Sequence, residues 1–227
     1  MWWLFPAVLW IIFLIYCLLP NYWARNCSSK VLRGGSSNKR KIYLTFDDGP
    51  NPDYTPRLLD ILGEHQIQAT FFLMGRQAEL YPDIVKRIAE EGHTIGCHSY
   101  SHRHAWLMSP VLTFKDMSRA YEAISLASGI FPKWYRPPWG GFNLFSIAAA
   151  GRLGLGIAYW SIEAQDWDIN TAAEHIHETV VDKAVPGSVI VLHDNQGDPG
   201  APENTLMALP MIIRSLRKDG YSFASLE

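Results

Sequence analysis

Two adjacent aspartates follow a short apolar run near residue 45. Asp47 and Asp48 come directly after "KIYLTF" (41–46) and precede a Gly-Pro step. Neighbouring carboxylates repel each other when both are ionised, so a fold that keeps them together needs positive charge close by. Such a pair can divide two tasks, because one carboxylate can bind a metal cation while the other stays free as a base.

Two histidines four residues apart supply further groups of the kind that bind metals. His98 and His102 lie in "HSYSH", and on one helical turn or a tight loop their rings would point the same way. The pair alone does not define a site. Together with a carboxylate from another strand end it forms a His-His-Asp set, and such a set with an open coordination position suits catalytic Zn²⁺.

Short apolar runs alternate with helical patterns from residue 41 onward. The apolar runs predict strands, and they cover 41–46, 68–74, 93–97, a short stretch near "KWYR", 155–161, 188–193 and the closing "YSFASL". Helices are predicted between them, over 57–65, 81–92, 113–128, 142–154, 171–184 and 204–220. This alternation predicts an α/β fold with a parallel sheet, either a distorted and incomplete (β/α) barrel of about seven strands or a doubly wound open sheet.

Polar clusters follow the predicted strands at the same end. Besides the two aspartates and "HSYSH", the clusters are "RPPWG" (136–140), "EAQDW" (163–167) and His193 in "VIVLHDN". In parallel barrels the reactive groups lie where strands end and βα loops begin. The clusters therefore predict one site at the mouth of the barrel.

These clusters resemble, in order, the motifs of the polysaccharide deacetylase family, the NodB homology domain of carbohydrate esterase family 4. The likeness covers roughly residues 40–227. "TFDDGP", "HSYSH" and "VLH" match the first, second and fifth motifs. "RPPWG" resembles the third, in which Tyr or Phe often stands at the position of Trp139. "EAQDW" resembles the fourth, usually D-x-x-D-W, with Glu163 in place of the first Asp.

The resemblance implies a role for each matched residue. Asp47 is expected to be the general base, Arg136 to orient it, and His193 to be the general acid oriented by Asp166. The metal ligands are expected to be Asp48, His98 and His102, which would hold a divalent metal, usually Zn²⁺ and in some members Co²⁺ or Ni²⁺. The substrate contacts are expected to be the backbone N–H of Trp139, for the oxyanion, and the side chains of Trp167 and Leu192, for the acetyl group.

The implied function is a metal-dependent hydrolase that removes N-acetyl groups from amino sugars of a polysaccharide. Peptidoglycan or a chitin-like glycan is the expected substrate. Two alternatives stay open from the sequence. One is a cytoplasm-facing deacylase of a lipid-linked sugar, and the other is a non-catalytic carbohydrate-binding protein on the same fold. The net charge of −2 gives no support for nucleic-acid binding. The three cysteines do not form a disulfide framework, and the sequence indicates no oligomeric state.

The first residues differ in composition from the rest of the chain. Residues 2–20 carry no charge, and aromatic residues stand near both ends of this stretch, which predicts a membrane anchor over 1–23. A cleaved signal peptide is the rival interpretation, but the stretch lacks a preceding Lys or Arg and a small-x-small site. A polar linker is predicted over 24–40 and the deacetylase domain over 41–227.

Two features of the sequence predict opposite orientations of the anchor in the membrane. Basic residues follow the apolar stretch, namely Arg25, Lys30, Arg33, Lys39, Arg40 and Lys41. The positive-inside rule would keep this flank, and hence the domain, in the cytoplasm. Family resemblance favours the opposite side. We therefore predict a single-pass protein of the cell membrane with an extracytoplasmic catalytic domain.

Overall fold

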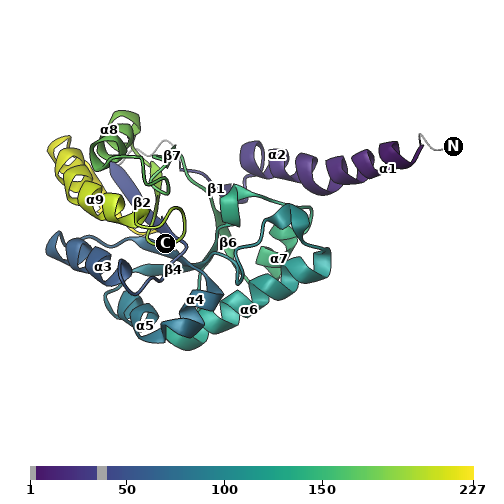
Figure 1. The fold of residues 1–227 in the computed structure, drawn as a ribbon, viewed down its shortest axis with the longest axis horizontal. Helices are drawn as coiled ribbons and strands as arrows, with labels where there is room; N and C mark the ends of the chain where they lie inside the picture. The colour runs from purple at the N-terminus through teal and green to yellow at the C-terminus, as the bar shows by residue number, and fades with distance from the viewer. Residues whose placement is uncertain (1–3, 35–39) are drawn as a thin grey trace.

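The fold is a curled sheet of nine parallel strands with helices on its outer face (Figure 1). The computed structural model describes residues 4–34 and 40–227. The strands are β1 (Val31–Leu32), β2 (Lys41–Asp47), β3 (Thr70–Leu73), β4 (Thr94–Cys97), β5 (Trp134–Tyr135), β6 (Gly156–Ala158), β7 (Ile162–Glu163), β8 (Val189–His193) and β9 (Ser222–Ala224). They are ordered β1-β6-β5-β4-β3-β2-β8-β7, with β9 also paired to β2.

Helices connect the strands and cover the sheet. They are α3 (Thr55–Glu64), α4 (Gly75–Leu80), α5 (Pro82–Glu90), α6 (Pro110–Ser128), α7 (Ser146–Arg152), α8 (Ala173–Lys183) and α9 (Ala201–Lys218). Two short 3₁₀ turns, η2 (Ala105–Leu107) and η3 (Pro138–Gly140), lie in the loops after β4 and β5. Helix α6 begins earlier than predicted, because the Ser109 side chain accepts a hydrogen bond from the Leu112 N–H and Pro110 occupies the first turn.

The sheet curls until its two ends nearly meet. The strand expected over 155–161 contains only β6, and β7 follows directly at 162–163, although the two belong to opposite ends of the strand order. Because only residues 159–161 separate them, the sheet has to close on itself at this point. The Tyr159 N–H donates to the Leu32 carbonyl at 2.6 Å, and the Ser161 N–H donates to the Val189 carbonyl at 2.9 Å. The expected distorted, incomplete (β/α) barrel is confirmed.

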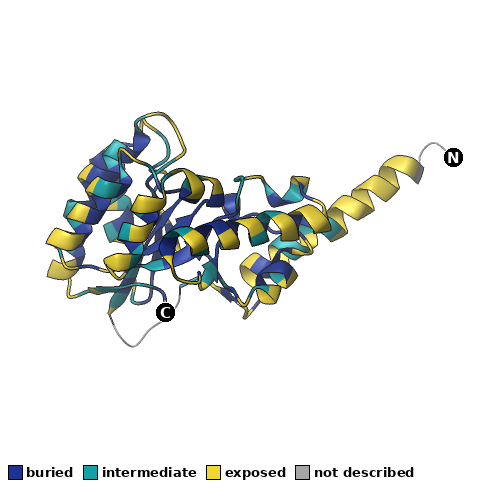
Figure 2. Cartoon of the chain, turned by 90° about the horizontal axis from the view of Figure 1, so that it is seen from below, coloured by how far each residue is buried: buried dark blue, intermediate teal, exposed yellow. Residues whose placement is uncertain are grey.

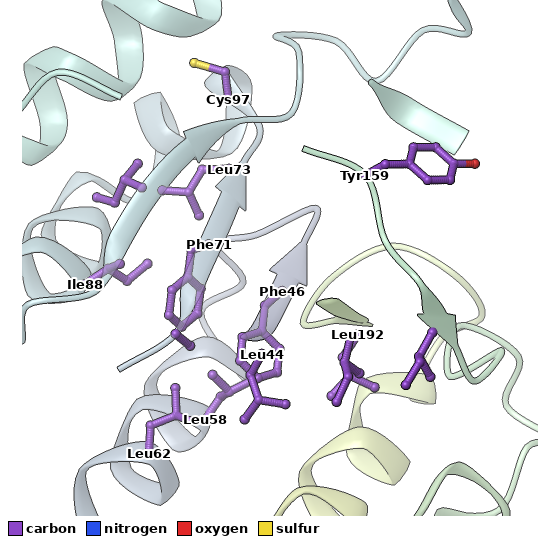
Figure 3. Packing of buried hydrophobic residues seen from close by; sticks show 14 of the residues in the cluster. Leu44, Phe46, Leu58, Leu62, Phe71, Leu73, Ile88, Cys97, Tyr159 and Leu192 are labelled. Carbon is purple, nitrogen blue, oxygen red and sulfur yellow. The ribbon is translucent and has the colours of Figure 1, made fainter. Parts of the chain in front are cut away.

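Side chains on the strands alternate between two cores. One set points outward to the helices, and Figure 3 shows Leu44 and Phe46 of this set close to Leu58 of α3. The other set fills the inside of the barrel and consists of Phe72, Ala158, Val189 and Leu226, with Tyr43, Trp134 and Trp160 around them. This alternation sends the polar residues at the strand ends into the mouth of the barrel.

The chain begins with a long apolar helix that projects from the domain (Figure 1). It consists of α1 (Leu4–Phe13), a π-helical turn η1 (Leu14–Leu18) and α2 (Leu19–Asn26). The stretch Phe5–Asn26 is long and apolar enough to cross a membrane, and it could serve as an anchor or as a signal sequence. Figure 2 shows its projecting part exposed along its whole length.

The segment after this helix is partly ordered. The sequence predicts a linker over 24–40, yet α2 continues to Asn26 and β1 pairs with β6, Val31 opposite Ile157. Two stretches, 1–3 and 35–39, lie outside the described residues, and they include the start of the expected anchor and part of the expected linker.

Candidate active site

Asp47 ends β2 and lies inside the barrel mouth. In the sheet register it is opposite His193 of β8 and Phe72 of β3. Asp48 follows with a backbone φ of +76°, in the left-handed region, so the chain turns sharply between the two aspartates. Both side chains are almost fully buried. The turn sends the neighbouring carboxylates toward different partners.

Asp48 converges with the two histidines of "HSYSH". Its Oδ1 lies 3.2 Å from His98 Nε2 and 2.9 Å from His102 Nε2. Burial opposes ionisation of Asp48, but the His102 and His98 imidazoles outweigh it and hold the pKa of this carboxyl below its ordinary value. Among the described residues, Asp48 Oδ1 has no partner in hydrogen-bond geometry although it is buried.

These three residues fit a divalent metal. Each offers one ligand atom, and the three atoms lie within 4.8 Å of one another. One carboxylate and two imidazoles are the donor set of catalytic sites with an open position. The buried, unpaired Oδ1 of Asp48 is the feature that a cation would satisfy. The positive φ of His102, +53°, shows that its backbone is held in an uncommon conformation to bring the ring there.

Arg136 holds the other aspartate. Its side chain is completely buried, and its Nη1 donates to Asp47 Oδ1 at 2.6 Å and to the Thr45 hydroxyl at 2.7 Å. Its Nη2 donates to the Tyr159 carbonyl at 2.9 Å. Burial lowers the pKa of Arg136, and the contact with Asp47 opposes that change. A buried guanidinium needs such a partner, so this ion pair fixes the position of the Asp47 carboxylate.

His193 is held by Asp166 in two places. Its backbone N–H donates to Asp166 Oδ2 at 2.7 Å, and its ring Nδ1 lies 2.8 Å from Asp166 Oδ1. The Thr205 hydroxyl also donates to Asp166 Oδ2, at 2.9 Å. Burial lowers the pKa of His193, but Asp166 more than offsets this and raises it to about 10. Nδ1 therefore carries the proton that Asp166 accepts, and Nε2 is the ring nitrogen left for chemistry.

A cavity at the barrel mouth joins these groups. It is lined by Asp47, Asp48, His98, His102, Trp139, Trp160, Glu163, Trp167, Val191, His193, Gln196 and Gly197. The Trp139 ring packs on His102 with centroids 4.3 Å apart and on His104 at 5.6 Å, while 58% of the residue stays exposed. Trp167 meets the His193 ring edge-on at 5.4 Å. Aromatic walls of this kind suit the faces of sugar rings.

Comparison with known proteins identifies the family. The profile described as "Polysaccharide deacetylase" matches residues 34–158. The chain belongs to the polysaccharide deacetylase family. It is 38% identical over 192 residues to a peptidoglycan-N-acetylglucosamine deacetylase of Bacillus cereus, which covers 85% of this chain and 69% of that protein. It is 34% identical over 198 residues to a chitooligosaccharide deacetylase of Rhizobium leguminosarum bv. trifolii, covering 84% and 92% of the two chains.

A solved relative has the same fold. The crystal structure of the Bc1960 peptidoglycan N-acetylglucosamine deacetylase matches with a TM-score of 0.83 and 36% identity, over 90% of this chain and 94% of that chain. This chain is thus a metal-dependent polysaccharide deacetylase of carbohydrate esterase family 4 with an Asp-His-His metal site.

One expected substrate contact of this deacetylase lies elsewhere. Leu192 is fully buried in the core between the sheet and the helices, and Figure 3 shows it there. The cavity is lined instead by Val191 and His193. The reason is the two-residue alternation of a strand, which points Leu192 outward when its neighbours on both sides point inward. Leu192 is therefore not among the residues that line the cavity, whereas its neighbour Val191 is.

A group of buried polar residues outside the family motifs supports the deacetylase site beneath Asp48. Asp194 is buried and accepts a hydrogen bond from the Thr55 hydroxyl, and burial raises the pKa of Asp194 to about 7. The Asn195 side chain donates to the Asp48 carbonyl at 3.1 Å and accepts from Asn51 at 2.9 Å. These residues hold the turn that carries Asp48. The one signal in the sequence is that Asp194 and Asn195 directly follow His193 at a strand end.

Proposed function

We propose that this deacetylase is a zinc enzyme that removes N-acetyl groups from the N-acetylglucosamine residues of peptidoglycan, on the outer side of a membrane in which its N-terminal helix anchors it. One observation carries the proposed chemistry. Asp47 and Asp48 are neighbours, but Asp47 pairs with Arg136 while Asp48 pairs with the two histidines. The Asp48 carboxylate is thereby available to bind the metal, and the Asp47 carboxylate is available to accept a proton.

Asp47 is the general base in this proposal. A cation bound by Asp48, His98 and His102 would supply acidity to a water molecule and polarise the acetamide carbonyl. Asp47 accepts the proton of the attacking water, and Arg136 orients its carboxylate through a hydrogen bond of 2.6 Å. The Trp139 backbone N–H stabilises the negative charge that develops on the carbonyl oxygen, and one such donor contributes about 3 kcal/mol.

His193 is the general acid. The leaving amine must gain a proton when the C–N bond breaks, and a histidine whose pKa is raised to about 10 is protonated at neutral pH. Asp166 holds the ring by Nδ1 at 2.8 Å, so Nε2 delivers the proton. The products are acetate and a free amino sugar.

Zinc is the favoured metal because of the donor set. Two imidazoles and one carboxylate, with room for a further ligand, are a frequent arrangement around catalytic Zn²⁺. The same set accepts Co²⁺ and Ni²⁺. Metal analysis of the purified chain distinguishes them.

Two observations support the substrate and the location. The relatives named above act on peptidoglycan N-acetylglucosamine and on chitooligosaccharides, which share the N-acetylglucosamine unit. Peptidoglycan lies outside the cytoplasmic membrane, so an anchored enzyme that modifies it has to face outward. The helix is docked on the domain through side-chain hydrogen bonds, as expected for a segment that stays in the mature protein.

Acetate release tests the proposal directly. The purified full chain is incubated with peptidoglycan, chitin and xylan fragments, with and without a chelator. We expect acetate from peptidoglycan, loss of release with the chelator, and recovery on addition of Zn²⁺. The His102→Ala variant is the control that should stay inactive after metal addition. Release that is insensitive to chelation, or none from any N-acetylated fragment, would refute the proposed reaction.

A further inference from the structure

Apolar side chains gather on one exposed edge of the domain, on η2, the first turns of α6 and the loop before α7. This surface, the apolar ledge, consists of Leu107, Val111, Leu112, Phe114, Leu144 and Phe145. The exposed fraction reaches 83% at Leu107 and 73% at Val111. Val111, Phe114 and Phe145 line one shallow hollow, so these side chains are contiguous. Contiguous exposed apolar surface marks an interaction site, whereas single exposed apolar residues do not.

The N-terminal helix docks beside the ledge. The Phe13 ring meets Trp106 edge-on with centroids 5.5 Å apart. The Tyr16 hydroxyl donates to the Met108 carbonyl at 2.6 Å, and the Tyr16 ring lies 6.1 Å from that of Phe145. Trp106 and Met108 are the chain neighbours of Leu107, so helix and ledge share one surface.

The helix sequence is suited to this docking. Pro20 has no backbone N–H, so the Tyr16 carbonyl lacks the donor that an α-helix would give it four residues later. The Leu144 N–H of the ledge supplies a hydrogen bond to this carbonyl, at 2.9 Å. An unpaired carbonyl is costly at membrane depth, so this bond ties the domain to the helix at the level of Tyr16.

The exposed part of the helix sets the depth of the ledge. Large apolar side chains are exposed along it from Phe5 as far as Trp23. A membrane that covers them has to reach past Phe13, which already touches the domain at Trp106. Any placement that hides the helix from water therefore brings the ledge into contact with lipid.

The charges around the ledge fit an anionic lipid surface. No Asp or Glu occurs in 102–115 or in 137–155, whereas Arg103, Lys115 and Arg152 do. The Arg152 guanidinium lies over the Phe114 ring, 5.5 Å from its centroid. Basic side chains beside exposed apolar ones favour a bilayer that contains anionic phospholipid.

We propose that the apolar ledge lies against the lipid of the outer leaflet beside the helix and holds the domain against the membrane in one orientation. This inference rests on the helix being retained as an anchor, as in the proposed function. Trp139 at the cavity and Leu144 on the ledge belong to the same loop, so the cavity mouth stays close to the membrane surface.

Fluorescence quenching by lipid tests the placement. The full chain carries Cys27→Ser and a single added cysteine, from Leu107→Cys, Val111→Cys or Leu126→Cys, labelled with the NBD fluorophore. Leu126 is the matched control, since it is on α6, is 89% exposed and lies about 22 Å along the helix from Val111 at 1.5 Å per residue. Vesicles contain phosphatidylethanolamine, phosphatidylglycerol and a doxyl-labelled phosphatidylcholine.

We expect the doxyl lipid to reduce NBD emission at 107 and 111 by roughly twofold, as for groups in contact with lipid, and to leave 126 unchanged. Equal quenching at all three positions overturns the proposal. So does shielding of NBD at 107 by a second copy of the chain in lipid-free detergent, because the partner would then be protein.

A charged variant and a separate readout complete the test. Leu107→Asp with Val111→Asp should abolish the quenching of a label at position 112, introduced as Leu112→Cys, whereas Leu126→Asp should not. Quenching needs no turnover. A chain that is quenched but releases no acetate refutes the proposed reaction alone, and a chain that releases acetate but is not quenched refutes the ledge alone.

Discussion

The two aspartates at the end of β2 are adjacent in sequence, but their carboxylates have different partners. The positive φ of Asp48 turns its carboxylate away from that of Asp47, toward His98 and His102. Arg136 neutralises Asp47 from inside the barrel. Two sets of groups therefore offset the repulsion between the carboxylates. The Arg136 guanidinium acts on Asp47, and the two imidazoles, with a cation when one is bound, act on Asp48.

Exchange of one oxygen for nitrogen should separate these two roles. Asp47→Asn removes the base while leaving Asp48, His98 and His102 intact, so we expect full metal content with kcat reduced about 10²- to 10⁴-fold. His102→Ala should lose both metal and activity. Metal stoichiometry and acetate release on the same preparations measure the two effects. If Asp47→Asn also loses the metal, the base and ligand assignments are wrong.

Asp166 should set the alkaline limit of the reaction. Its carboxylate raises the pKa of His193, so the protonated general acid persists at high pH, and activity is present below the raised pKa and lost above it. Asp166→Asn removes the negative charge, and the alkaline limb of kcat should move to lower pH by about 1 to 3 units.

The control for that change is Thr205→Val. Thr205 donates to the same carboxylate but carries no charge, so its loss should shift the limb far less than Asp166→Asn does. A pH profile that is unchanged in Asp166→Asn would exclude His193 as the group that titrates.

Motif residues could be predicted from the sequence, but the residues beneath them could not. Paired acids, spaced histidines and a single arginine at predicted strand ends can be recognised in the amino-acid sequence. Thr45 and Thr55 read as ordinary strand and helix residues, and only their contacts with Arg136 and Asp194 reveal a role. Motif position predicts Leu192 as a cavity residue, but strand alternation places its neighbour Val191 in the cavity lining.

At the scale of elements, the turn after β2 depends on a close approach between two loops. A Cβ atom on Gly49 would lie 2.5 Å from both carboxylate oxygens of Asp194. Gly49→Ala should therefore displace the turn that carries Asp48, weaken metal binding and lower the melting temperature. The control is Gly63→Ala in α3, where a Cβ would meet nothing within 4 Å.

We expect Gly63→Ala to be neutral or stabilising by up to about 1 kcal/mol, since Ala favours a helix interior over Gly. Calorimetric titration with Zn²⁺ and thermal unfolding measure both variants. Unchanged zinc affinity in Gly49→Ala would show that the turn tolerates the displacement.

The alternation of strands and helices was predictable, and the closure of the barrel was not. β1 and β7 each have two residues, too few to show any periodicity. Their pairing depends on the curl of the whole sheet, which brings distant strands together. A polar segment such as 24–40 gives no sign in its composition that Val31 will pair with Ile157.

At the scale of the whole molecule, the three arginines after the anchor have structural partners. Arg33 donates to the carbonyls of Ala24 and Arg25, both at 2.5 Å, and so caps the end of α2. Arg25 lies over the Tyr159 ring, 5.1 Å from its centroid, and Arg40 lies over Tyr221 at 4.5 Å. The charge flank that would favour a cytoplasmic domain therefore has a separate origin in folding, which supports the outward orientation.

Labelling of the native cysteines should report that orientation in whole cells. Cys27 is exposed just beyond the helix, whereas Cys17 and Cys97 are buried. An outward domain places Cys27 within reach of a membrane-impermeant maleimide, so we expect one label per chain in intact cells and none in Cys27→Ser. Permeabilised cells give the maximum labelling for comparison. If Cys27 is labelled only after permeabilisation, the domain faces the cytoplasm, and a lipid-linked sugar on that side becomes the substrate to test.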